Sequence, residues 1–127
     1  MNTEKVLFAF FIVLALTLNF GFFIGDIREA SHHNVYELFA AIVISLVATV
    51  MKLGDRTHVG AVLLATSLVA DLQLIIASII WGHATQISPT GLDESALASI
   101  VSLSGGALLA NFLSVILLTV ETVMVRR

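Results

Sequence analysis

Four long apolar segments dominate the sequence and limit what the chain can fold into. They run from Val6 to Ile24, Tyr36 to Leu53, Val59 to Trp81 and Ala96 to Val120. Lys and Arg are absent from them apart from Lys52 near the end of the second. A helix of about 20 apolar residues crosses the roughly 30 Å of hydrocarbon in a bilayer. Each segment therefore predicts a transmembrane helix.

The predicted fold is all-α, a polytopic membrane protein with a single transmembrane domain over residues 1–127. Only 12% of the residues are charged and 58% are hydrophobic, which excludes an ordinary soluble domain. Backbone groups in lipid must pair within the chain, and the alternating pattern of barrel strands is absent. The short connections at 25–35, 54–58 and 82–95 favour antiparallel neighbours. We therefore expect a four-helix antiparallel bundle.

The charged residues and the missing motifs exclude several classes of function. Six Lys and Arg stand against nine Asp and Glu, with no basic run, so nucleic acid is not expected as a partner. Cysteine is absent, which removes disulfides and thiolate chemistry. No nucleophile elbow, phosphate-binding loop or dinucleotide-binding turn occurs. We predict neither an enzyme nor a bound cofactor.

Basic residues predict the orientation of the bundle. Only Arg28 falls on one side of a four-span topology, and the other basic residues fall on the opposite side. Lys and Arg concentrate in short cytoplasmic loops. Both termini are therefore expected in the cytoplasm, on the side that carries Lys5, Lys52, Arg56, Arg126 and Arg127.

Asp71 is the most informative single residue, because it falls near the middle of the third segment. A charge at the centre of a membrane helix costs roughly 2.5 to 3.5 kcal/mol, and such residues usually face the bundle interior or a water path. No basic residue lies at a similar depth in any segment. This carboxyl group can be satisfied in four ways: by protonation, by hydration, by a bound cation or by a basic residue of a partner protein.

Polar residues at helical spacing extend from Asp71 into a predicted path. Ser67 and Ser78 share its helical face, while Ser104 and Asn111 form a line on the fourth segment. Antiparallel packing places Ser104 and Asn111 on either side of Asp71 in depth, so Asn111 is expected to reach it. A second line, with Thr66 and Gln73, predicts that the third helix contacts protein or water on two sides.

Small residues recur at four-residue spacing and predict close helix contacts. Such stripes let helix backbones approach each other in lipid. Whether they meet within one chain or between copies stays open. The predicted packing residues are Gly21 and Gly25 in the first segment, Ala41, Ser45 and Thr49 in the second, and Ser102, Gly106 and Ala110 in the fourth.

A metal site is not predicted, although the first connection comes nearest to one. If that connection is helical, Glu29, His33 and Glu37 lie on one face at four-residue steps, a spacing that suits a divalent metal. The adjacent His32 and His33 do not share a helix face, and no zinc-protease motif occurs. A solvated loop or a proton-sensitive gate are the alternatives.

Two hypotheses of function follow from Asp71. In the first, the protein forms oligomers and conducts or senses a cation or proton along Asp71, Ser67, Ser78, Ser104 and Asn111. In the second, it is a non-conducting accessory subunit whose Asp71 pairs with a larger membrane complex. The lipid bilayer is the common partner of both. A chain with so few helices favours assembly in either case.

Two stretches carry a resemblance to a known family: Lys52-Leu-Gly-Asp-Arg56, and the segment from Ala65 to Ile76 that contains Asp71 and Gln73. Together they resemble a little-studied family of small bacterial four-helix inner-membrane proteins of unknown function. The resemblance implies a location in the bacterial inner membrane and no particular activity.

Overall fold

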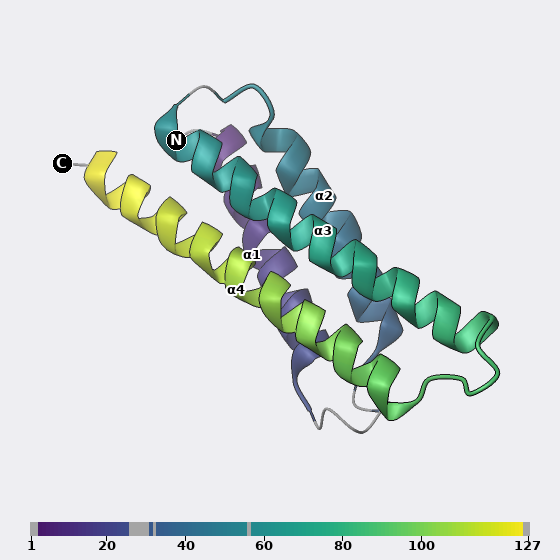
Figure 1. Ribbon diagram of the computed structural model, residues 1–127. Coiled ribbons are helices and arrows are strands. Elements are labelled where there is room, and N and C mark those ends of the chain that lie inside the picture. The colour runs from purple at the N-terminus through teal and green to yellow at the C-terminus, as the bar shows by residue number, and fades with distance from the viewer. Residues whose placement is uncertain (1–2, 26–30, 32, 56, 126–127) are drawn as a thin grey trace.

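The computed structural model describes residues 3–25, 31, 33–55 and 57–125. Four α-helices form an elongated bundle: α1 (Thr3–Phe23), α2 (Val35–Lys52), α3 (His58–Gln86) and α4 (Glu94–Val125), as Figure 1 shows. No β-strand occurs in these residues, and each helix is long and apolar enough to cross a membrane. The predicted all-α four-helix membrane bundle is therefore confirmed.

Each helix packs against two neighbours. The main contacts join α1 to α2 and α4, and α3 to the same two helices. The beginning of α1, the connection from α2 to α3 and the end of α4 lie at one end of the bundle, and the other two connections lie at the opposite end (Figure 1). Successive helices are therefore antiparallel, as the short connections predict.

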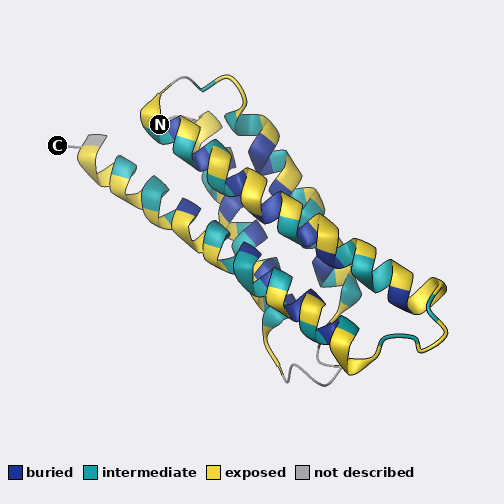
Figure 2. Ribbon diagram, in the orientation of Figure 1, coloured by how far each residue is buried: buried dark blue, intermediate teal, exposed yellow. Residues whose placement is uncertain are grey.

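The core consists of one buried stripe from each helix (Figure 2). Two clusters of buried apolar side chains fill most of it. The first cluster, nearer the α1–α2 and α3–α4 connections, contains Phe22, Leu38, Ala41, Ala70, Leu74, Ala77, Ile100 and Ala107. The second, nearer the other end, contains Phe8, Ile12, Ala48 and Leu63. Buried polar side chains lie among these apolar residues near the middle of the bundle.

α3 and α4 extend beyond the apolar segments that predict them. α3 continues five residues past Trp81 to Gln86, and α4 begins at Glu94 instead of Ala96. A hydropathy pattern reports the part of a helix that suits hydrocarbon, whereas backbone hydrogen bonds continue into the polar interface. The connection between α3 and α4 is therefore shorter than the predicted 82–95.

Side-chain caps define where α2 and α3 begin. The Asn34 side chain accepts a hydrogen bond from the Tyr36 N–H, and the Thr57 hydroxyl accepts one from Gly60. Asp55 holds the second cap in place, because the hydroxyl and N–H of Thr57 both donate to its Oδ1. These hydrogen bonds, with a smaller contribution from Lys52, lower the pKa of Asp55. The α2–α3 connection is thus fixed by local polar contacts.

Candidate functional site

A central polar layer crosses the middle of the bundle, among buried members of the two apolar clusters. All four helices contribute to it, and all of its members are buried. Along α1 it lies between Ile12 and Phe22, and along α3 between Leu63 and Leu74. We define the layer by Asn19 from α1, Ser45 and Thr49 from α2, Ser67 and Asp71 from α3, and Ser104, Asn111 and Ser114 from α4.

Asp71 is the ionisable member of this layer and lies near the middle of the 29-residue α3. Its side chain faces α2 and is only 4% exposed. The Ser45 hydroxyl donates to Oδ1 at 2.6 Å, and Thr49 Oγ1 lies 2.5 Å from Oδ2. No ion pair involves Asp71 in the part of the chain that the structure describes. Hydroxyl groups, and no basic side chain, therefore hold the carboxyl group.

Thr49 stands between two acceptors. Its Oγ1 lies 2.9 Å from the carbonyl oxygen of Ser45, one turn earlier in α2, and 2.5 Å from Asp71 Oδ2. A hydroxyl group has one hydrogen to donate and two lone pairs that accept. Ser45, Thr49 and Asp71 therefore form one connected hydrogen-bond network between α2 and α3.

On the other side of the layer, Asn19 joins α1 to α4. The surrounding donors and acceptors determine which way the Asn19 amide points. In that orientation its nitrogen donates to the Ser104 carbonyl at 2.9 Å. Its oxygen accepts from the Leu108 N–H at 3.0 Å and from Asn111 Nδ2 at 3.2 Å. Ser104 and Leu108 are four residues apart, so one amide bridges the backbone groups of a whole turn of α4.

Two contacts fix the depth of α3 against α4. Thr66 Oγ1 lies 2.5 Å from Ser114 Oγ, and Gly106 lies directly against the amide of Gln73. Antiparallel counting between these pairs places Asp71 opposite residues 108–109 of α4. Asp71 is therefore at the depth between Ser104 and Asn111, as the sequence predicts. The second polar line of α3, Thr66 and Gln73, faces α4.

The structure separates some residues of the predicted path. Ser78 is only partly buried, and its hydroxyl donates to the carbonyl of Ile75 in its own helix, outside the layer. The Ser104 hydroxyl donates to the backbone carbonyl of Val101 in its own helix. Asn111 bonds to Asn19, and not to Asp71 as the sequence suggests. The partners of Asp71 come instead from α2: they are Ser45 and Thr49, for which the sequence predicts helix packing.

The predicted packing residues have mixed outcomes. Ala41 is buried in the first apolar cluster, and Ala110 packs against it. A Cβ at Gly21 would overlap the Glu37 carboxylate, so this side chain of α2 occupies the space beside Gly21. Ser102, however, is exposed on the single chain. Gly25 follows the end of α1 with φ of +118°, a backbone conformation that favours glycine, so it is not part of a helix face.

The residues of the first connection do not assemble a described metal centre. His33 is buried, and its Nδ1 lies 2.6 Å from the carbonyl oxygen of Phe22 near the end of α1. Glu37 packs beside Gly21 in the first turns of α2. Glu29 lies outside the described residues. Within those residues no group of three His, Asp or Glu side chains is arranged to hold a metal ion.

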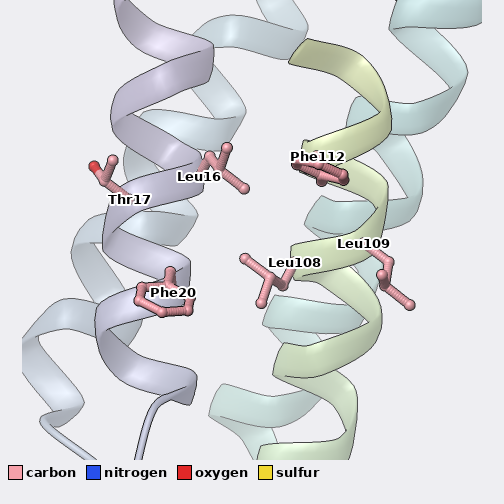
Figure 3. Close-up of a pocket in the computed structure, with 6 residues that line it drawn as sticks. All are labelled: Leu16, Thr17, Phe20, Leu108, Leu109 and Phe112. Atoms are coloured by element: carbon pink, nitrogen blue, oxygen red, sulfur yellow. The ribbon is translucent and has the colours of Figure 1, made fainter. Parts of the chain in front are cut away.

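A separate apolar groove of about 440 Å³ opens between α1 and α4 (Figure 3). Phe20 on one wall and Leu109 and Phe112 on the other are exposed in the single chain. Thr17 points away from α4 in this view, and its hydroxyl donates to Leu14 in its own helix. The groove is a lipid-compatible surface, distinct from the polar layer.

Fold and site together define a small multi-pass membrane protein with a buried carboxyl group at the centre of a four-helix bundle. The chain matches the family of unknown function DUF6394 over residues 32–122, and it belongs to that family. This membership confirms the family resemblance seen in the α2–α3 region. No curated protein and no solved structure matches the chain.

Proposed function

We propose that this protein is a proton sensor of the membrane, in which Asp71 takes up and releases a proton and thereby changes the packing of α2 against α3. One observation carries the proposal: a carboxyl group near the middle of a membrane-spanning helix is buried against two hydroxyl groups, with no described basic partner. An ionised carboxylate in such a place is costly, whereas a neutral carboxyl group is not.

The number of hydrogens in the network supports a bound proton. Three contacts link Ser45, Thr49 and Asp71, but the two hydroxyl groups supply only two hydrogens. A proton on Oδ2 of Asp71 provides the third, because Asp71 then donates to Thr49 while Thr49 donates to the Ser45 carbonyl. Loss of that proton leaves one contact without a hydrogen and one charge without a counter-ion.

Occlusion favours sensing over steady conduction. Apolar clusters lie along the helices on both sides of the polar layer, and Asp71 is almost fully buried. Water must therefore enter before an ionised Asp71 is solvated, and the α2–α3 contact is the nearest one to open. The described titratable side chains of the two helices that pack on α3 lie near the helix ends: Tyr36, Glu37 and Lys52 on α2, and Glu94 and Glu121 on α4.

A distance measurement between α2 and α3 tests this proposal. The chain has no cysteine, so Val43→Cys and Leu72→Cys introduce a unique pair for spin labels at exposed positions. In lipid nanodiscs we expect one short distance at low pH and a longer one after Asp71 loses its proton. An unchanged distance over the whole pH range in which the protein stays folded would overturn the proposal.

A flux assay separates sensing from conduction. In vesicles that contain the purified protein and a trapped pH dye, an imposed membrane potential should drive no steady proton current at low pH, where the network is closed. A constant proton or sodium current at every pH would instead favour a conducting path and contradict the sensor. The proposal assigns no enzymatic activity.

The burial of Asp71 also argues against a non-conducting accessory subunit in which Asp71 pairs directly with a larger membrane complex. A basic residue of another protein reaches Asp71 only if α2 and α3 first separate, because the carboxyl group faces α2. The two hydroxyl groups that contact the carboxyl group among the described residues both belong to α2. Oligomerisation remains a prediction, and the mass of the protein in detergent is the measurement that checks it.

We further propose that both termini are cytoplasmic in a bacterial inner membrane. Lys5 and Lys52 lie toward the end of the bundle where α1 begins and α4 ends, and Arg56, Arg126 and Arg127 lie outside the described residues. Reporter fusions after residue 127 and within 54–58 should be active in the cytoplasm, and a tag near Pro89 should be periplasmic. A periplasmic C-terminus would contradict this orientation.

A further inference from the structure

We propose that Ser67 and Asn111 bind a water molecule inside the bundle, next to Asp71. Ser67 Oγ and Asn111 Oδ1 are buried polar atoms with no hydrogen-bond partner among the described residues, and both side chains are 0% exposed. Buried polar atoms of this kind are normally satisfied by protein or by an internal water, which typically makes two to four hydrogen bonds.

The two side chains lie at a similar depth in the bundle. Both lie between the Thr66–Ser114 hydrogen bond and the contact of Gln73 with Gly106, which fix the depth of α3 against α4. Antiparallel counting from the hydrogen bond places Ser67 opposite residue 113, about 3 Å along the axis from Asn111 at 1.5 Å per residue. Both belong to the inward-facing stripes of adjacent helices.

Ser67 behaves differently from the other hydroxyl residues of α3. Thr66, Ser78 and Thr85 each donate to a backbone carbonyl three or four residues earlier in α3. This bond is the usual way for a hydroxyl group in a helix to satisfy itself. Ser67 makes no such bond, so its hydroxyl is available to a ligand in the core.

The chemistry of the two groups suits water. Asn111 Oδ1 accepts only, and its nitrogen already donates to Asn19, whereas the Ser67 hydroxyl both donates and accepts. A water molecule donates to Asn111 and exchanges a hydrogen bond with Ser67. Ser67 and Asp71 are one turn apart on the same helix, so this water lies beside the carboxyl group.

Such a water gives Asp71 a local partner for its proton, a role that rests on the proposed function. It also connects the Asp71–Ser45–Thr49 network on the α2 side to the Asn19–Asn111 pair on the α1 side. Residues of all four helices then take part in the polar contacts around Asp71.

Solid-state NMR in lipid tests the site directly. Magnetisation transfer from water to the side-chain amide of Asn111 should be rapid, although this residue is fully buried, and should be lost or strongly slowed in Ser67→Ala. Ser78→Ala is the matched control, because that hydroxyl bonds within its own helix, and it should leave the transfer unchanged. Absence of transfer in the wild-type protein would overturn the proposal.

The sign of a stability change provides a second test. If the site is dry, Ser67→Ala removes an unpaired buried hydroxyl and the thermal midpoint stays constant or rises; if water is bound, the midpoint falls. A fall supports the site, and a constant or raised midpoint contradicts it. If water magnetisation reaches Asn111 but the α2–α3 distance does not depend on pH, the proton-sensor proposal is wrong and the water site stands. If the distance depends on pH but no magnetisation reaches Asn111, only the water site is wrong.

Discussion

Asp71→Asn should remove the pH response of the α2–α3 distance and leave the bundle folded in its closed form. The amide oxygen accepts from Ser45 as Oδ1 does, and the amide nitrogen donates to Thr49 as a protonated Oδ2 does. The variant therefore reproduces the neutral carboxyl group but has no proton to release. The same spin-label pair should report the short distance at every pH.

Asp71→Leu provides the contrast that separates proton binding from simple packing. Leucine removes the acceptor of the Ser45 hydroxyl and the donor to the Thr49 hydroxyl, and a buried polar group left unpaired costs about 1–3 kcal/mol. We expect a lower thermal midpoint for Asp71→Leu and a nearly unchanged one for Asp71→Asn. If Asp71→Asn keeps a pH-dependent distance, another group is the sensor and the role given to Asp71 is wrong.

The fold is predictable from the sequence because a backbone in hydrocarbon must form all of its hydrogen bonds within the protein, which few structures allow. Four apolar segments of sufficient length require four helices, and their short connections require antiparallel neighbours. The ends of the helices were less predictable. Gln86 and Glu94 continue their helices outside the apolar segments, where hydropathy no longer distinguishes a helix from a loop.

The site was only partly predictable, because depth follows from counting residues along a helix whereas helix rotation does not. Asp71 lies at the predicted depth, yet its carboxyl group faces α2 instead of α4. The sequence predicts small-residue packing at Ser45 and Thr49, but two hydroxyls one turn apart near mid-membrane also make a pair of donors. The exposure of Ser102 and the loop position of Gly25 likewise depend on rotation and on where a helix ends.

Gly106→Leu should cause a large loss of folded protein. A Cβ at this position would lie 2.7 Å from Nε2 and 3.0 Å from Cδ of Gln73, so a leucine forces α3 and α4 apart or expels the amide. Overpacking of this kind typically costs about 1–3 kcal/mol. Because the contact lies within one chain, the loss should appear as a low yield and a lower thermal midpoint, and not as a change of oligomer mass.

Three matched variants make this prediction specific to the α3–α4 contact. Gly82→Leu introduces the same side chain where a Cβ meets nothing within 4 Å, so it should be tolerated. Leu109→Ala truncates a side chain that is 70% exposed and should change the midpoint little. Gln73→Ala combined with Gly106→Ala removes the obstructing amide and should restore folding relative to Gly106→Ala alone. Equal midpoints for Gly106→Leu and the wild type would mean that α4 does not need close approach to α3 at this position.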